Sequence, residues 1–283
     1  MGLFDRDERQ PGSSGFGPII IGIAMALFGL FSYLTHTEKN PITGAKQHIS
    51  LTPNQEIRLG LESAPRMAAQ MGGEVSQSDP RAQEVRRIGQ EIVSKTEAHQ
   101  GPWRFKYHLL KDDKTINAFA LPGGQIFITL GLYNLLQNEA QLAGVLGHET
   151  GHVIQRHAAQ QMAKGELGQM LVTATGVGAS GHNHGREAAL VAGVVNQMTQ
   201  LHYGRDDELE ADQWGLKLMA EAGYNPKAML DVMEILEKSA PSGQKPEMLL
   251  THPYPETRIV HIKKYLSEHP STGNLGLGNP LPR

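Results

Sequence analysis

His148-Glu149-Thr150-Gly151-His152 is the stretch from which the architecture of this chain can be worked out. A four-residue spacing on a helix turns the side chains by only about 40° relative to each other, so both imidazoles leave one face, one turn apart. The small and apolar residues 143–147 (AGVLG) directly before the stretch indicate that this helix is buried. Because a buried imidazole needs a polar partner, and a metal ion can supply one, we predict a zinc-binding helix over 138–163.

Glu149 directly follows His148 in the motif and is the candidate for its catalytic group. A carboxylate at this position can reach a metal-bound water without being a ligand, take its proton and pass that proton to a leaving amine. The competing interpretation is an exposed helix that carries two histidines and a glutamate by chance. The apolar residues before the motif weaken that interpretation, but the motif alone does not exclude it.

A catalytic zinc site needs a third protein ligand, and the nearest histidines are poor candidates. In the elongated form of the motif, a glycine at 155 and a histidine at 158 would follow, whereas this chain has Gln155 and Ala158. We therefore predict that His157 lies on the surface. His182 and His184 belong to a glycine-rich stretch, and we predict that they are exposed.

An acidic helix downstream supplies a better third ligand. Glu208 and Asp212 are four residues apart and share a helix face. Glu208 would complete a site of two histidines and one glutamate with an open fourth position, and Asp212 could accept a hydrogen bond from a zinc-bound imidazole. The alternative is a solvated acidic helix face to which Glu210 also belongs.

Length and composition limit the classes of function. The chain of 283 residues can form one domain of about 200 residues with appendages. Its net charge is −3 and it has no basic run, so we expect no nucleic-acid partner. It contains no cysteine, which excludes disulfides, thiolate zinc sites and cysteine catalysis.

An apolar segment near the N-terminus predicts a membrane anchor. Residues 17–34 carry no charge and approach the roughly 20 residues that a helix needs to cross a bilayer. A cleaved signal peptide and a buried helix are the alternatives, and the flanking charges fix the orientation only weakly. The predicted organisation is a disordered tail (1–16), a transmembrane anchor (17–35), a linker (36–53), a metallopeptidase domain (54–268) and a disordered tail (269–283).

The pattern of apolar residues within the domain predicts an α+β fold that is mostly helical. A helix-start signal lies at Thr52. A small sheet is expected from three alternating or apolar stretches, of which the last two meet at Pro122-Gly123-Gly124. The expected strands are 105–109, 115–121 and 125–130, and the expected later helices are 138–163, 186–202, 206–222, 226–238 and 255–268.

Four stretches together resemble a known family. They are Asn117-Ala118-Phe119-Ala120-Leu121-Pro122-Gly123-Gly124, His148 to His152, Arg205 to Asp212, and Thr251-His252-Pro253 with Arg258. In order and spacing, over about residues 50–268, the chain is similar to the HtpX-like and BepA-like zinc metallopeptidases, whose family also contains the CAAX prenyl protease. The resemblance implies a zincin-type domain with one zinc ion per chain.

The resemblance also implies a role for each matching residue. It implies that the zinc ligands are His148, His152 and Glu208, with Glu149 as the catalytic base. It places Asp212 and Arg205 behind the ligands, His252 close to zinc, and Asn117 and Ala118 on an edge strand that pairs with the substrate backbone. His252 could stabilise the oxyanion or occupy the open coordination site in a resting state. Arg258 would anchor this region to an acidic partner.

These observations predict a membrane-anchored zinc metalloendopeptidase that acts in protein quality control. Its expected partners are polypeptides, including misfolded membrane or envelope proteins, and membrane lipid through residues 17–35. By analogy with BepA-like proteins, we expect a single-pass protein with its catalytic domain outside the cytoplasm. Since the chain lacks the several hydrophobic helices of HtpX, the substrate stays open. The alternative function is that of a zinc-containing, non-hydrolytic chaperone or scaffold.

Overall fold

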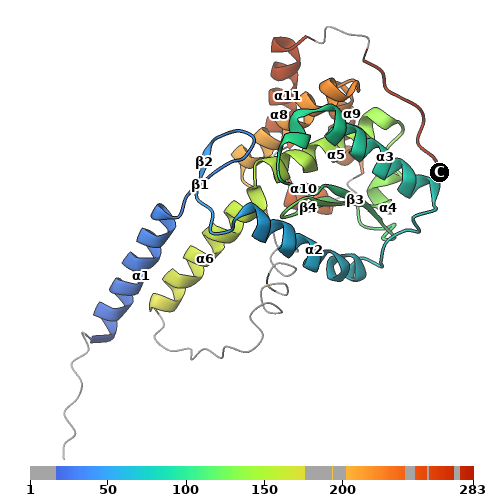
Figure 1. Ribbon diagram of the computed structural model, residues 1–283. Helices are drawn as coiled ribbons and strands as arrows, with labels where there is room; N and C mark the ends of the chain where they lie inside the picture. The colour runs from blue at the N-terminus through green and yellow to red at the C-terminus, as the bar shows by residue number, and fades with distance from the viewer. Residues whose placement is uncertain (1–16, 176–192, 194–201, 240–245, 254, 271–274) are drawn as a thin grey trace, which may run out of the picture.

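The structure is a computed structural model that describes residues 17–175, 193, 202–239, 246–253, 255–270 and 275–283. It is mostly helical, with small sheets, and the helices of the domain gather around a three-stranded sheet (Figure 1). The described elements are α1 (Gly17–Thr35), β1 (Glu38–Lys39), β2 (Lys46–Gln47), α2 (Pro53–Gln70), α3 (Pro80–Lys95), the 3-10 helix η1 (Glu97–Gln100), β3 (Lys106–Leu110), β4 (Ala118–Leu121), β5 (Gln125–Thr129), α4 (Leu130–Tyr133), α5 (Glu139–Ile154), α6 (His157–Thr175), α8 (Arg205–Ala222), α9 (Ala228–Lys238), α10 (Glu247–Thr251) and α11 (Pro255–Glu268).

The predicted small sheet is confirmed. Its strand order is β3-β5-β4, with β3 parallel and β4 antiparallel to the central β5. The turn between β4 and β5 contains Gly123 and Gly124, whose φ angles of 79° and 108° suit glycine and few other residues. Strand β4 is therefore an edge strand, and α5 packs against it.

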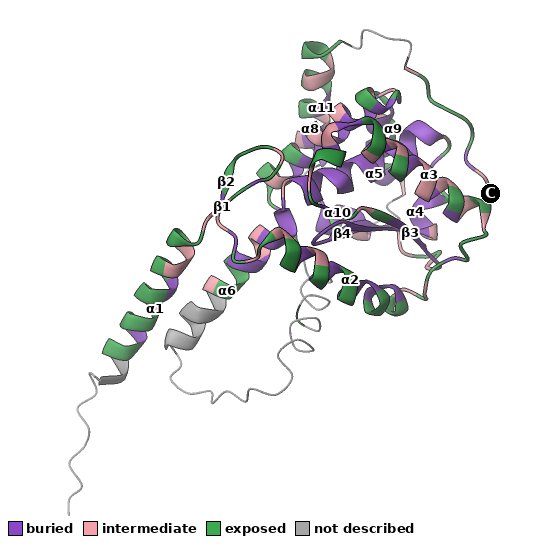
Figure 2. Cartoon of the chain, viewed as in Figure 1, coloured by how far each residue is buried: buried purple, intermediate pink, exposed green. Residues whose placement is uncertain are grey.

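Helix α5 is the centre of the domain. Every one of its residues is buried, including the polar residues of the 148–152 motif (Figure 2). Asn138 caps its first turn by accepting a hydrogen bond from the backbone N–H of Gln141. Helices α3, α8 and α9 and strand β4 pack around α5, so polar groups on α5 can face only other protein groups or a bound ligand.

Glycines allow α5 and α8 to approach each other closely. A Cβ atom on Gly151 would lie 2.8 Å from Cβ of Trp214 and 2.9 Å from the carbonyl oxygen of Ala211. A Cβ atom on Gly215 would lie 3.0 Å from the backbone nitrogen of His148. The two backbones are therefore in contact at the level of the histidine motif, which brings side chains of α8 within reach of it.

The predicted single helix over 138–163 is wrong in one respect, because it is broken after Ile154. Arg156 has a φ of 59°, the left-handed conformation, which ends α5 before α6 begins at His157. Its guanidinium holds the break by donating from Nε to Oε1 of Glu56 (2.8 Å) and from Nη2 to the carbonyl of Leu51 (2.7 Å). The spacing of apolar residues depends only on near neighbours in the chain, so it could not predict these long-range partners.

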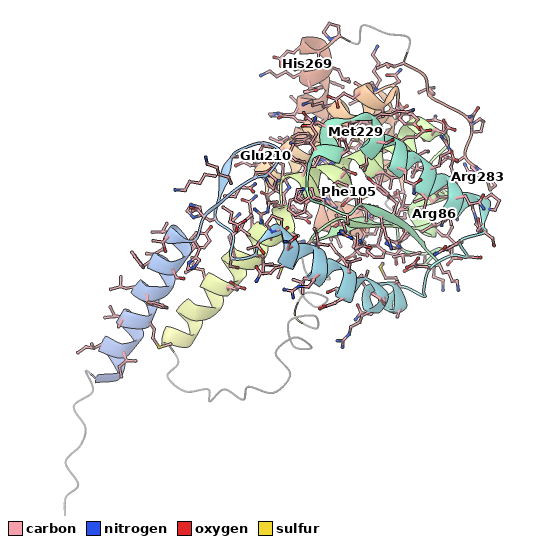
Figure 3. The ribbon with its side chains drawn as sticks, viewed as in Figure 1. Arg86, Phe105, Glu210, Met229, His269 and Arg283 are labelled. Atoms are coloured by element: carbon pink, nitrogen blue, oxygen red, sulfur yellow. The ribbon has the colours of Figure 1, made fainter. Side chains whose placement is uncertain are left out.

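The predicted linker and C-terminal tail differ from the structure. In the 36–53 segment, β1 and β2 pair, and buried Asn40 donates to the carbonyl of Ile154 at 2.7 Å. Residues 275–283 are not free of the domain, because their backbone bonds to the start of α5 and Leu281 is only 5% exposed. Figure 3 labels Arg283, which donates to the carbonyls of Asn134 and Leu136. The sequence predicted a disordered tail because residues 275–283 show no apolar periodicity. An extended segment that binds through its backbone does not need such a pattern.

Other predictions concern the N-terminus and residues 176–202. Within the described part of the chain, no helix has both the length and the apolar character needed to cross a membrane, so the transmembrane anchor predicted over 17–35 is not supported. Helix α1 instead lies alongside α6 (Figure 1). The predicted tail 1–16 lies outside the described residues, as do His182, His184 and nearly all of the helix predicted over 186–202.

The close contact of α5 with α8 generates a stability prediction. Gly151→Ala should lower the free energy of unfolding by about 1–3 kcal/mol, because the added methyl group overlaps Trp214 and Ala211. Gly144→Ala on the same helix is the matched control, since its Cβ would meet Met229 Sδ at an ordinary 3.5 Å. The free energy of unfolding of the control should rise by up to about 1 kcal/mol, because alanine has a higher helix propensity than glycine. Urea unfolding with chelator present measures both, and equal values for the two variants would contradict the packing argument.

Candidate metal centre

Four buried side chains from three places in the fold converge at the centre of the domain. His148 and His152 come from α5, Glu208 comes from the first turn of α8, and His252 directly follows α10. Each is at most 2% exposed, and their ligand atoms all lie within 4.8 Å of one another. The structure therefore brings together the residues that the resemblance assigned to zinc, including His252 from more than 40 residues farther along the chain.

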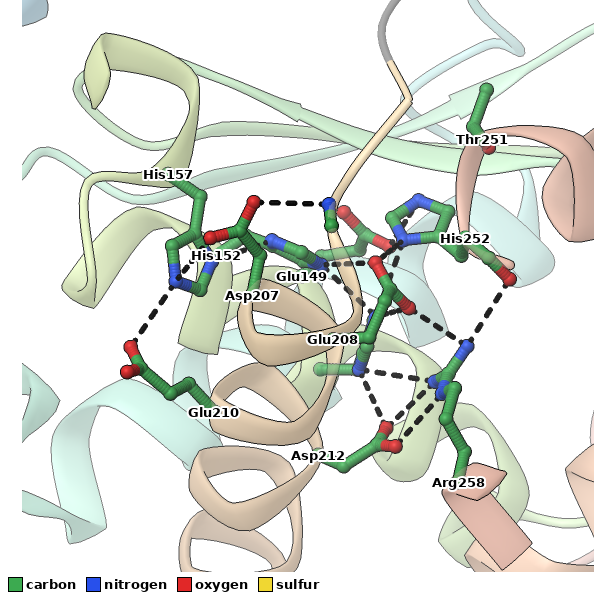
Figure 4. A network of polar contacts seen from close by, with 12 residues as sticks. Glu149, His152, His157, Asp207, Glu208, Glu210, Asp212, Thr251, His252 and Arg258 are labelled. Atoms are coloured by element: carbon green, nitrogen blue, oxygen red, sulfur yellow. Dashed lines mark hydrogen bonds and ion pairs between the residues drawn. The ribbon is translucent and has the colours of Figure 1, made fainter. Parts of the chain in front are cut away.

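The nitrogen and oxygen atoms of this cluster lie close together, and Figure 4 labels three of its members, His152, Glu208 and His252. Nε2 of His148 and Nε2 of His152 are 3.1 Å apart, and carboxylate oxygens of Glu208 lie 3.6 Å and 3.5 Å from them. Nδ1 of His252 is 3.3 Å from Nε2 of His148 and 3.0 Å from Oε1 of Glu208. Imidazole nitrogens with one carboxylate are the donor set that zinc prefers in hydrolytic sites.

Charge also fits a divalent cation here. Glu149, Glu208 and Asp212 are three buried carboxylates. Arg258 is a buried, permanently charged cation beside them, and His252 is a buried titratable group in contact with Glu208 and Glu149. When all three carboxylates are ionised and the histidines are neutral, the group carries −3 + 1 = −2. A doubly charged ion would neutralise it, and burying uncompensated charge is costly.

Arg258 links the acidic residues behind the cluster. It donates from Nε and Nη2 to the two carboxylate oxygens of Asp212 at 2.8 Å and 2.6 Å, and its Nη1 lies 2.9 Å from Oε2 of Glu208. Oδ1 of Asp212 in turn lies 2.9 Å from Nδ1 of His148. Asp212 thereby orients His148 with Nε2 toward the cluster, and Arg258 has the acidic partner expected from the sequence.

Glu149 differs from the other carboxylates. It is fully buried, and neither of its carboxylate oxygens has a hydrogen-bond partner among the described residues. Burial raises the pKa of Glu149, although the charges of His252 and His148 oppose that rise. A buried carboxylate without a hydrogen-bond partner is costly to keep, and one titratable neighbour of Glu149, Nε2 of His252, lies 3.6 Å from its Oε1.

Two members of the cluster, His152 and Glu208, have pKa shifts that suit metal binding. Burial holds the pKa of His152 well below its ordinary value, so the ring is neutral and has a free lone pair. Burial alone would raise the pKa of Glu208, but the charges of His252 and Arg258 outweigh it and lower that pKa well below the usual range. Neutral imidazole and ionised carboxylate are the forms that bind a cation. Burial would lower the pKa of His252, but the charges of Glu208 and Glu149 outweigh it and raise that pKa.

His157 contradicts its sequence prediction. It is 1% exposed instead of lying on the surface, and its Nδ1 is 2.8 Å from Nδ1 of His152 (Figure 4). The break at Arg156 turns the chain so that His157 faces back toward α5. The group of residues that could hold a metal does not include His157, and the motif comparison could not show that His157 stands behind His152.

Tyr203 is a residue that sequence reasoning missed. Its ring stacks on the imidazole of His152, with centroids 4.0 Å apart, and its buried hydroxyl has no hydrogen-bond partner among the described residues. Its place directly before the acidic helix was the sole sequence signal. Arg205 is exposed at the first position of α8, so the role predicted for it behind the ligands stays a prediction.

The predicted substrate strand lies beside a cavity next to the cluster. The cavity has a volume of about 280 Å³, and Asn117, Phe119, Met67, Met71 and His252 are among the residues that line it. The carbonyl of Asn117 accepts from the N–H of Thr129, whereas Ala118 is the next residue along the edge strand β4.

Comparison with known proteins agrees with this geometry. Residues 79–266 match peptidase family M48. The chain belongs to peptidase family M48. The matched part contains the whole buried cluster, and zinc is the metal that metallopeptidases of this family use. The family resemblance predicted from the four sequence stretches is thereby confirmed, and so is zinc as the expected metal.

Named relatives fall into two groups. The beta-barrel assembly-enhancing protease of Escherichia coli is 33% identical over 190 residues, which cover 64% of this chain and 38% of that protein. The mitochondrial metalloendopeptidase OMA1 of Schizosaccharomyces pombe is 30% identical over 255 residues, covering 88% of this chain and 72% of that protein. The OMA1 of Saccharomyces cerevisiae is 29% identical over 262 residues. This chain thus spans less than half the length of the bacterial relative.

The arrangement around Arg258 generates a second stability prediction. Arg258→Met should lower the free energy of unfolding of the metal-free protein by about 3–5 kcal/mol, because it leaves Asp212 and Glu208 buried without their cation. Lys264→Met on the same helix, whose side chain is 68% exposed, should change it by less than about 0.5 kcal/mol. Urea unfolding in the presence of chelator tests both. A small effect of Arg258→Met would mean that other groups neutralise the buried charge of Asp212 and Glu208, and would contradict the prediction.

Proposed function

We propose that this chain is a zinc metalloendopeptidase in which His148, His152 and Glu208 bind the metal and Glu149 is the general base. The observation that carries the proposal is the buried carboxylate of Glu149, which has no hydrogen-bond partner among the described residues and lies beside a cluster able to hold a metal. A purely structural zinc site needs no base, and retaining an unpaired buried carboxylate there would only be costly. Catalysis gives that carboxylate a partner, namely the attacking water.

The chemistry of the proposed reaction divides between the metal and the chain. Zinc, when bound, supplies Lewis acidity that polarises the scissile carbonyl and acidifies the attacking water. Glu149 accepts the proton of that water and delivers it to the leaving amine nitrogen. Nε2 of His252 has no hydrogen-bond partner among the described residues and lies 3.6 Å from Oε1 of Glu149. We assign it to the oxyanion, as a hydrogen-bond donor.

The edge strand β4 supports a peptide substrate. Opposed residues in an antiparallel pair alternate between exchanging hydrogen bonds and not exchanging them. Since the carbonyl of Asn117 bonds toward β5, the backbone of Ala118 points away from β5, on the side of β4 that has no neighbouring strand in the described part of the chain, and Ala118 is fully buried there. We propose that Ala118 pairs with the substrate backbone and that Asn117 contributes its buried, unpaired Oδ1 to the adjoining cavity.

The cavity beside this strand suggests the kind of side chain that a substrate places there. Phe119, Met67 and Met71 give it an apolar wall, and the two thioethers can adjust to different shapes. A volume of about 280 Å³ accommodates a large apolar side chain. We therefore propose cleavage next to large apolar residues, which are exposed when a protein is misfolded.

The cellular setting is also part of the proposal. The relatives named as a beta-barrel assembly-enhancing protease and a mitochondrial metalloendopeptidase support polypeptide substrates and a role in protein quality control. Helix α1 leaves Phe28 and Phe31 65% and 66% exposed, which supports association with a membrane surface. We place the catalytic domain outside the cytoplasm. Comparative proteomics of cells with native or Glu149→Gln protein would identify the substrates.

The base assignment generates a sharp prediction. Glu149→Gln should keep one zinc ion per chain and lower kcat for casein cleavage by about 10²–10⁴-fold, because the amide cannot accept the proton. Glu221→Gln, on the outer part of α8, is the control and should leave the rate unchanged. The native rate should vanish with chelator and return with zinc. Native activity in Glu149→Gln would remove the mechanism, and a native protein that binds zinc but cleaves nothing would favour the non-hydrolytic chaperone.

His252 can act on the oxyanion or hold the enzyme latent. If it stabilises the oxyanion, His252→Ala should lower kcat by about 10²–10³-fold. If its ring instead blocks the metal, as its contacts of 3.3 Å with His148 and 3.0 Å with Glu208 would allow, the substitution should raise the rate. We expect the loss. Measured casein cleavage by zinc-loaded protein distinguishes the two roles, and a higher rate would contradict the oxyanion assignment.

A further inference from the structure

His157 occupies a place that its sequence position did not reveal. It is the first residue of α6, directly after the left-handed Arg156, and it is buried. Its ring meets that of His152 almost edge-on, at 73° with centroids 4.9 Å apart, so that the two Nδ1 atoms are 2.8 Å from each other. This is a hydrogen-bond distance between two ring nitrogens, and one of them must carry the proton.

The metal side of His152 decides which nitrogen that is. Nε2 of His152 faces Nε2 of His148 at 3.1 Å, so Nε2 is the atom available to a metal and must keep its lone pair. Nδ1 of a neutral His152 therefore carries the hydrogen and donates it to Nδ1 of His157. His157 is then an acceptor at Nδ1 and carries its own hydrogen at Nε2.

Glu210 completes the chain of hydrogen bonds. Its Oε2 lies 3.3 Å from Nε2 of His157 and accepts from the side-chain amide of Gln155 at 2.8 Å (Figure 4). The carboxylate is 51% exposed. The order from solvent to metal is thus Glu210, His157, His152. Three residues that looked unrelated in the sequence are joined because the chain reverses at Arg156.

The two metal-binding imidazoles consequently have different supports. His148 is held directly by Asp212, a carboxylate that is only 2% exposed and is paired with Arg258. His152 is held by a neutral imidazole, and the carboxylate stands one residue farther out. A carboxylate behind a metal-bound histidine is the usual arrangement, whereas an intervening imidazole places a second ring in control of the ligand's orientation.

We propose that His157 is the positioning residue for the metal ligand His152: it accepts the Nδ1 hydrogen and thereby holds Nε2 toward the zinc. The proposal rests on the proposed function in one respect, which is the assignment of His152 as a ligand. Glu210 acts through His157 by accepting its Nε2 hydrogen. Since water can replace a half-exposed carboxylate, Glu210 contributes less than His157 does.

The test measures zinc affinity by competition with a chromophoric chelator, using the full chain. His157→Leu should raise the zinc Kd by roughly 10–100-fold, the range found for partners of metal-bound histidines. His157→Asn keeps an oxygen where Nδ1 stood and can still accept from His152, so its Kd should recover most of the loss. Glu210→Ala should raise the Kd less than His157→Leu does, and Glu221→Gln on the same helix should not change it.

Each outcome has one meaning. An unchanged Kd in His157→Leu, or equal losses in His157→Leu and His157→Asn, overturns the proposal, because the second result would mean packing instead of a hydrogen bond. Thermal unfolding of the metal-free variants shows whether His157→Leu folds, and His157→Asn carries the test if it does not. His152→Ala should abolish binding. If it leaves the Kd unchanged, the ligand assignment fails, which is distinguishable from failure of the role of His157.

Discussion

The contact between α5 and α8 is the constraint on which the rest of the molecule depends. Two helices normally keep 8–10 Å between their axes because side chains separate them. Here Gly151 and Gly215 remove those side chains, and a single added Cβ at either position would meet the opposite backbone at 3.0 Å or less. His148 and Glu208 can approach one metal because their helices touch in this way. Adjacent residues of the 148–152 motif therefore serve the buried cluster and the packing of the two helices.

Burial of polar groups follows from that contact and shapes the electrostatics of the site. The histidine motif lies on a helix with no exposed residue, so every polar atom on it needs a partner within the protein. Asp212 and Arg258 satisfy His148 on one side, and His157 satisfies His152 on the other. On this helix, Glu149 is the residue whose two carboxylate oxygens have no hydrogen-bond partner among the described residues, and Nε2 of His252 lies 3.6 Å from one of them.

Arg156 is one residue that connects the N-terminal segment to the site. Arg156 bonds to Glu56 in α2 and to the carbonyl of Leu51, and the reversal at Arg156 is what turns His157 toward His152. Residues well before the domain core thus help to set the geometry behind a metal ligand. A short-range pattern could not disclose this, because the partners of Arg156 lie about one hundred positions away in the chain.

Sequence alone determined the features that depend on local spacing and residue chemistry. A four-residue interval placed His148 and His152 on one face, and the acid types available downstream selected Glu208 and Asp212. The alternation of apolar and polar residues, together with the glycines of the 122–124 turn, predicted the small sheet. Only the tertiary structure decided where the helix breaks, that His157 is buried, that residues 275–283 pack on the domain, and which groups Arg258 and Tyr203 contact. The physical reason is that helix periodicity is a property of neighbouring residues, whereas a buried ion pair, a stacked ring or a left-handed residue is stabilised by partners that only folding brings together.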